Sequence, residues 1–95
     1  MSARTKSYTE GLQARLKDPG YAAEYLSAAA EEGKAEFLLA LRDAAKARGV
    51  ATVAKAAKRG RESLYKALSK NGNPGLDTVL SILQALHVKV HFEPA

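Results

Sequence analysis

Apolar residues recur every three or four positions along most of this chain, a spacing that places them on one face of an α-helix. Asp18-Pro19 has the form of an N-cap followed by proline at the first helical position, and it predicts a helix over residues 19–32. A second apolar stripe predicts a helix over residues 35–48, with Gly49 as its C-terminal cap. The two stripes comprise Tyr21, Ala22, Tyr25, Leu26 and Ala29, then Ala35, Leu38, Leu41, Ala44 and Ala45.

Shorter patterns flank these two helices. Leu12 and Leu16 predict a short helix or turn near the N-terminus. Beyond the second helix, two short helices are expected over residues 51–58 and 61–70, with a tight turn at Arg59-Gly60 between them. The residues expected to face inward are Val53, Ala54, Ala57, Leu64, Ala67 and Leu68.

After residue 70 the pattern changes twice. The turn-forming segment 71–75 precedes a long helical stripe that ends at His87, formed by Leu76, Val79, Leu80, Leu83 and Leu86. Residues 88–92 then alternate apolar and polar, which is typical of a strand, with Val88, Val90 and Phe92 on its apolar face. No other segment resembles a strand, so its simplest partner is the same strand of a second copy, and these three residues are predicted to mediate dimerisation.

Composition favours one small, mainly helical domain. The 95 residues include nineteen Ala but only 7 Gly and 3 Pro, and Ala loses the least entropy in a helix. A chain of this length has room for one core and a short docking region. The predicted fold is therefore all-α, with five to six helices and one short C-terminal β-strand.

Several classes of function are not expected. The chain has no Cys, and its longest apolar run covers only residues 37–41, so we expect a cytoplasmic protein without a membrane anchor. His87 directly precedes the predicted strand and His91 lies within it, and two His cannot complete a metal site by themselves. No catalytic constellation is present, so no metal, no cofactor and no enzymatic activity are predicted.

The positive charge is concentrated in the middle of the sequence. Residues 42–70 hold nine basic and two acidic side chains, whereas residues 1–41 hold five basic and six acidic ones. A cluster of this kind is typical of a surface that neutralises nucleic-acid phosphates, although a plain solvated face is the commoner outcome for charge clusters in general.

The segment AKAAKRGRESLYKAL at residues 54–68 has the layout of a helix-turn-helix: a small residue at the helix crossing, a turn four residues later, and a buried Leu64 in the second helix. The following NPGLDTVLSILQALHV is similar to the segment after the recognition helix in the Xre/Cro, lambda-repressor-like superfamily. From about residue 8 to 94 the chain resembles the HigA-like family of addiction-module antidotes, including DPGYAAEYLSAAAEEGKAEFLLALRDAAKARG.

This resemblance implies an antitoxin of a type II toxin–antitoxin module. Members are small helical homodimers that bind operator DNA, repress their own operon and neutralise a RelE/ParE-type toxin by direct binding. In this chain, residues 1–33 would form the toxin-contact region, and residues 34–95 the DNA-binding domain with its dimerisation strand. The alternative is a stand-alone, phage-type transcriptional regulator without a toxin partner.

Site residues follow from the helix-turn-helix layout. The first turns of a recognition helix reach base edges, which selects Arg61, Glu62, Ser63 and Lys66 as candidate base contacts. Glu62 has alternative roles in orienting Arg61 or capping its own helix. Residues flanking this helix are candidate phosphate contacts: Thr52, Lys58, Arg59, Tyr65, Lys70 and Asn71. Tyr65 fits equally well as a residue at the rim of the core.

The candidate toxin contacts lie in the N-terminal third. Exposed Tyr side chains are common anchors at protein interfaces, and three of the four Tyr fall within residues 8–25. The resemblance implies that this part contacts the toxin, which selects Tyr8, Leu12, Leu16, Tyr21, Tyr25 and Leu26. The alternative is that these residues only pack the first helices onto the domain.

The chain departs from the family pattern at three helix ends. Lys58 stands where the family usually has Gly, so it is expected to take a left-handed backbone conformation. Gly60 replaces Ser as the cap of the recognition helix, and His87 replaces a helix-ending Gly.

Overall fold

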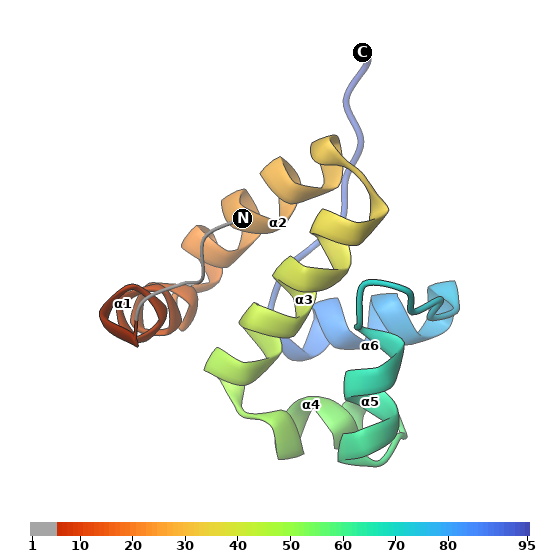
Figure 1. The fold of residues 1–95 in the computed structure, drawn as a ribbon. Helices are drawn as coiled ribbons and strands as arrows, with labels where there is room; N and C mark the ends of the chain where they lie inside the picture. The colour runs from red at the N-terminus through yellow and green to blue at the C-terminus, as the bar shows by residue number, and fades with distance from the viewer. Residues whose placement is uncertain (1–5) are drawn as a thin grey trace.

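The computed structural model describes residues 6–95 and contains six α-helices in that range, so the mainly helical prediction is confirmed. Figure 1 shows their arrangement. The helices are α1 (Lys6–Leu16), α2 (Pro19–Glu32), α3 (Lys34–Arg48), α4 (Val50–Ala56), α5 (Arg61–Ala67) and α6 (Leu76–Ala85). The predicted N-terminal region starts at residue 1, and its first five residues lie outside the described part.

Local signals at the helix ends fix the first half of the fold. The Asp18 carboxylate accepts a hydrogen bond from the Tyr21 backbone N–H at 2.9 Å, and Pro19 opens α2. Gly33 and Gly49 have φ of 141° and 118°, and each ends one helix while preceding the next. These positive φ angles let α2, α3 and α4 follow one another with single-residue breaks.

Helix α3 is the centre of the molecule. It packs against α1, α2 and α4, while α4 packs in turn against α5 and α6. Leu41, Val53 and Ile82 are completely buried where these helices meet. The other large buried residues of this core are Leu26, Leu38, Leu64, Leu68, Leu83 and Leu86.

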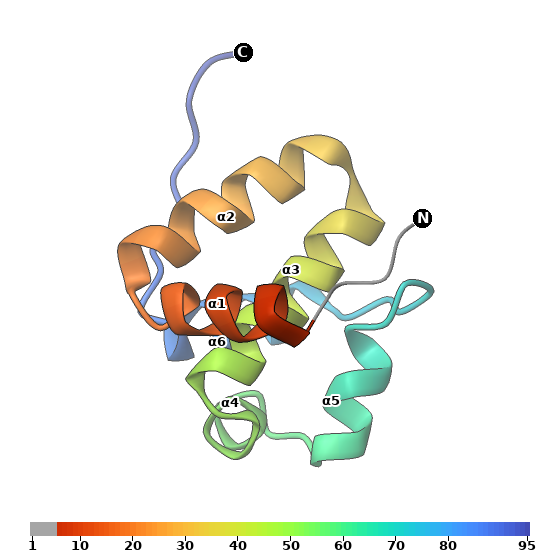
Figure 2. The ribbon, with the colours of Figure 1, turned by 60° about the vertical axis from the view of Figure 1, so that its left-hand side comes forward.

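A second, smaller cluster holds α1 in place. Leu12 and Leu16 of α1 pack with Ala22 of α2, against the partly buried Ala47 of α3 and Val88 after α6. Figure 2 shows α1 lying across the bundle, close to the end of α3. The N-terminal helices therefore share apolar surface with the rest of the chain.

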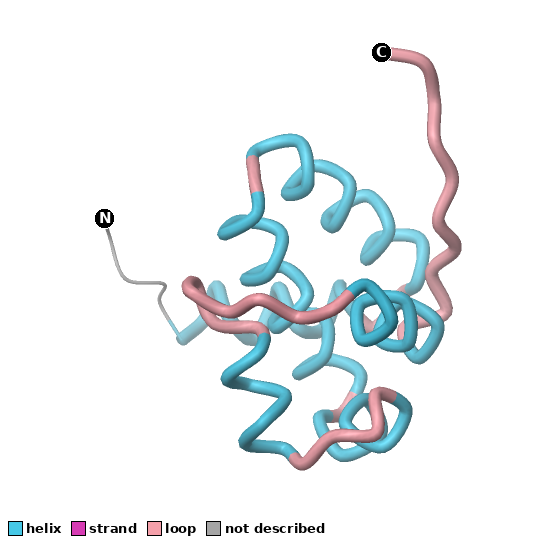
Figure 3. Tube along the Cα trace, turned by 90° about the vertical axis from the view of Figure 1, so that its right-hand side faces the viewer, coloured by secondary structure: helices cyan, strands magenta, loops and turns pink. Residues whose placement is uncertain are grey.

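The C-terminal strand is a correction to the sequence prediction. Residues 88–95 form an irregular segment that runs along α2 and then leads away from the helices (Figure 3). A strand needs a neighbouring strand to exchange backbone hydrogen bonds, and residues 6–95 of one chain supply none. The alternating pattern of residues 88–92 thus produces no strand within a single copy.

No helix within residues 6–95 has both the length and the apolar character that crossing a membrane requires.

Candidate nucleic-acid and partner interfaces

The turn between α4 and α5 is closed by two backbone hydrogen bonds. The Lys58 N–H donates to the Lys55 carbonyl at 3.1 Å, and the Arg59 N–H donates to the Ala54 carbonyl at 3.0 Å. This is the Schellman pattern, which requires a left-handed residue directly after the helix. Lys58 holds that position with φ of 57°, as expected from the sequence, and Gly60 caps α5 without a side-chain hydrogen bond.

Helix α5 has one buried face and one open face. Leu64 and Leu68 anchor it in the core. The four candidate base contacts lie on the surface of this helix and are exposed: Arg61, Glu62, Ser63 and Lys66. The four side chains predicted from the sequence to contact bases are therefore accessible to a binding partner on the open face of α5.

The loop after α5 forms a hollow beside the open face. Arg59, Ser63, Lys66 and Asn71 line a concave site of about 410 Å³. A side chain at Gly72 would collide with the Ala67 carbonyl, so glycine is needed where the loop meets the end of α5. The structure thus brings together residues from the turn, the helix and the following loop that the sequence assigned to DNA.

The polar contacts around this hollow are few. The Arg59 Nη1 donates to the Ser63 Oγ at 3.1 Å, so these two candidates are held together. The Lys34 Nζ donates to the Asn73 Oδ1 at 3.3 Å and ties the loop to the start of α3. The remaining phosphate candidates Thr52, Lys58 and Lys70 are exposed.

Tyr65 lies at the rim of the core. The guanidinium carbon of Arg42 is 5.2 Å from the centre of its ring, and the Lys46 Nζ is 5.8 Å from it. The ring therefore bridges α5 to α3, which favours the second of the two roles that the sequence left open. Arg42 and Lys46 were not selected from the sequence. The signal that could have identified them is their spacing of four residues within the basic segment.

The N-terminal candidates separate into two groups. Leu12, Leu16 and Leu26 are buried, at 4% exposure or less, so they pack α1 and α2 and are not accessible to a partner. This corrects their assignment as contact residues: a helix has a buried and an open face, and their side chains occupy the buried one.

Among these six candidate contacts, the three tyrosines are the ones whose side chains are at least partly accessible. Tyr21 and Tyr25 stack with ring centres 6.3 Å apart, and Arg15 donates from its Nε to the Tyr21 hydroxyl at 3.3 Å. The Tyr25 hydroxyl donates to the buried Asp43 carboxylate at 2.8 Å, which joins α2 to α3. Tyr8 on α1 is 48% exposed.

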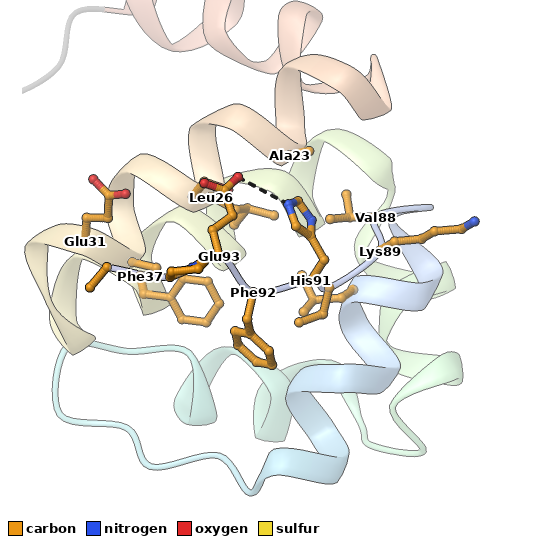
Figure 4. Close-up of a pocket in the computed structure, with 15 residues that line it drawn as sticks. Ala23, Leu26, Glu31, Phe37, Val88, Lys89, His91, Phe92 and Glu93 are labelled. Atoms are coloured by element: carbon orange, nitrogen blue, oxygen red, sulfur yellow. Dashed lines mark ion pairs between the residues drawn. The ribbon is translucent and has the colours of Figure 1, made fainter.

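The C-terminal segment borders an apolar hollow. Leu26, Phe37 and Leu83 contribute to its walls, together with residues 88–95, and its volume is about 600 Å³. Figure 4 shows Val88, His91, Phe92 and Glu93 gathered around it, with an ion pair of 3.5 Å between His91 and Glu93. Val88 is packed against the core, whereas Phe92 is 92% exposed.

Two further leucines extend this apolar surface. Leu76 and Leu80 of α6 are exposed, and their spacing from Leu83 places all three along one side of the helix. Val90 is also exposed. The surface formed by α6 and the C-terminal segment thus carries a group of accessible apolar side chains, which is typical of an interaction surface.

Comparison with known proteins assigns the family. The family model described as "probable addiction module antidote protein" matches residues 9–94. A protein of Haemophilus influenzae, named only as uncharacterized, is 42% identical over 66 residues, which are 68% of this chain and 68% of that protein. No solved structure gives a significant match. Since the family model spans nearly all of the described residues, the chain belongs to the family of probable addiction module antidote proteins.

Proposed function

We propose that this protein is the antitoxin of a type II toxin–antitoxin module, which binds operator DNA as a homodimer and neutralises a RelE/ParE-type toxin by direct contact. Family membership supports the antitoxin role. The observation that carries the DNA-binding role is the exposed face of α5. It presents Arg61, Glu62, Ser63 and Lys66 beside a hollow lined by Arg59 and Asn71.

In the proposed DNA complex, α5 enters the major groove with its N-terminal end toward the bases. Arg61 is the strongest candidate for a specific contact, since a guanidinium can bond two acceptors of one guanine. Lys58, Lys70 and Asn71 flank α5 and would hold phosphates, which fixes the register of the helix without reading sequence.

The proposed toxin surface uses the open sides of α1 and α2. Tyr8, Tyr21 and Tyr25 supply aromatic side chains that are at least partly accessible. Glu24 and Glu31 are exposed on the same α2 helix, and they would complement a basic toxin. The protein would act by binding alone, without a catalytic step, in the cytoplasm.

The proposed dimer is formed by the C-terminal segment and α6. The backbone of residues 88–92, apart from the Val88 N–H that closes α6, would pair with the same segment of a second copy, which supplies the partner strand that one chain lacks. The apolar side chains Leu76, Leu80, Val90 and Phe92 would then be covered. Such a two-fold arrangement would place two α5 helices about one DNA turn, ~34 Å, apart.

Salt-dependent binding to the DNA upstream of its own gene tests the DNA-binding role. With roughly 6–10 phosphate contacts per dimer, the affinity is expected to fall ~10³- to 10⁵-fold between 50 and 200 mM salt. Fluorescence anisotropy of a labelled promoter duplex measures this directly, with a scrambled duplex as the control. Absence of binding, or binding that does not change with salt, would contradict the proposal.

A further inference from the structure

Two cations of α3 converge on one aromatic ring of α5. Arg42 and Lys46 lie one helical turn apart, and their charged groups are 5.2 Å and 5.8 Å from the centre of the Tyr65 ring. Attraction between a cation and the ring face explains why each side chain extends toward α5. The ring therefore gathers two positive charges at one place beside the recognition helix.

Nothing in the described chain neutralises this pair. Within residues 6–95, no carboxylate forms a salt bridge with Arg42 or Lys46. The Arg42 Nε is buried and has no hydrogen-bond acceptor. Like charges one turn apart on a helix repel each other, and a buried donor without an acceptor is unfavourable. An anion bound between the two charged groups would relieve the repulsion between them. The Arg42 Nε is closed to solvent and takes no part in that contact.

The position of the pair complements the phosphate candidates chosen from the sequence. Arg59 and Asn71 lie with Ser63 on one flank of α5. Ser63 and Tyr65 are two residues apart, about 200° around a helix, so Arg42 and Lys46 lie on the opposite flank. A helix in the major groove has a phosphate backbone on each side, and the second backbone needs its own contacts.

We propose that Arg42 and Lys46, gathered by Tyr65, form an anion site that binds a phosphodiester of the DNA backbone on this second flank. The inference rests on the proposed DNA-binding function and adds to it a site outside the helix-turn-helix. Lys46 is exposed and supplies the accessible charge, while Arg42 is partly buried and supplies the fixed one. Tyr65 is a positioning residue that keeps the two together.

Salt titrations of charge-removing variants test the site. Lys46→Gln is expected to reduce the slope of log affinity against log salt by ~0.9 for each phosphate that the variant no longer neutralises, on promoter and random duplex DNA alike. Arg42→Gln is expected to reduce it similarly, with circular dichroism verifying that the helices are retained. Lys17→Gln removes the same charge from an exposed position between α1 and α2, and it should leave the slope unchanged.

The tyrosine variants test the positioning role. Tyr65→Phe keeps the ring and is expected to bind DNA as the unchanged protein does. Tyr65→Leu keeps both cations but removes the ring that gathers them, so a several-fold loss of affinity for both duplexes is expected. Equal affinities for Tyr65→Leu and Tyr65→Phe would overturn this role.

The outcome for the anion site is separable from the outcome for DNA binding itself. Suppose that the unchanged protein binds promoter DNA with a steep salt dependence, and that Lys46→Gln and Lys17→Gln both show the same salt slope as the unchanged protein. In that case the anion site is wrong and the proposed function stands. If the unchanged protein does not bind DNA, the proposed function fails first. Loss of toxin binding by Lys46→Gln, with DNA binding retained, would assign the cations to a protein partner and also overturn the site.

Discussion

At the scale of single residues, two residues other than glycine within the described range 6–95 hold left-handed backbone conformations. Lys58 has φ of 57° and His87 has φ of 60°, and each follows a helix that ends in the Schellman pattern. For His87, the Val88 N–H donates to the Leu83 carbonyl at 3.0 Å, which closes the end of α6. An L-residue in this conformation costs about 1–2 kcal/mol, so both helix ends carry local strain.

Replacing His87 by glycine is expected to stabilise the fold. The substitution relieves the left-handed strain but gives the unfolded chain more freedom, so the expected net gain is about 0.5–1 kcal/mol in the free energy of unfolding. Urea denaturation followed by circular dichroism measures it. Lys89→Gly, two residues further on at an exposed position, is the control and should give no gain. A variant His87→Gly no more stable than the unchanged protein would contradict the strain argument.

Arg61→Ala and Lys70→Ala are expected to differ in kind. Removing a base contact at Arg61 should reduce the preference for operator over random DNA by ~1–3 kcal/mol. Removing a phosphate contact at Lys70 should weaken binding to both duplexes equally and lower the salt slope. Competition titrations with operator and random duplexes distinguish the two. Identical behaviour of the two variants would show that base and phosphate contacts are divided incorrectly.

At the scale of elements, local signals determined which predictions were accurate. The caps at Asp18, Gly33 and Gly49 act within a few residues, so the bounds of α2 and α3 follow closely from the sequence. The strand at residues 88–92 requires a distant pairing partner, which a local pattern cannot supply. The Arg42–Lys46 pair was missed for the same reason, because only the packed fold brings α3 beside Tyr65.

The hydrophobic pattern also did not predict which of the apolar residues of α1 are buried. Tyr8, Leu12 and Leu16 are spaced by four residues and share one face of α1, and spacing alone does not say how far along that face the core extends. In the structure the leucines pack inward and Tyr8 is exposed. The candidate toxin surface is accordingly narrower than the sequence predicts and is defined by its tyrosines.

Shortening the chain after Val88 tests the role of the C-terminal segment. Val88 packs on the core and closes α6, so it must be kept, whereas residues 89–95 are exposed. Deleting residues 89–95 is expected to leave the helical content unchanged, to give a monomer and to weaken operator binding. Sedimentation velocity measures the change of mass. A shortened protein that still sediments as a dimer would place the dimer contact on the helices alone.

At the scale of the whole molecule, the proposed toxin interface and the proposed DNA interface lie on different sides of α3. Figure 1 shows α1 and α2 on one side of this helix, and α4 and α5 beyond its C-terminal end. A toxin seated on the tyrosines of α1 and α2 would leave the open face of α5 free. The arrangement therefore predicts that one dimer binds toxin and operator DNA at the same time.

Co-expression with the adjacent gene tests the central claim most directly. If the neighbouring reading frame encodes a toxin, its expression alone is expected to stop growth, and co-expression with this chain to restore it. The two proteins should then copurify as one complex. Tyr8→Ala should weaken that complex, whereas Lys55→Ala, at an exposed position on α4 outside the toxin surface, should not. A neighbouring protein that stays toxic and does not copurify with this chain would contradict the antitoxin assignment.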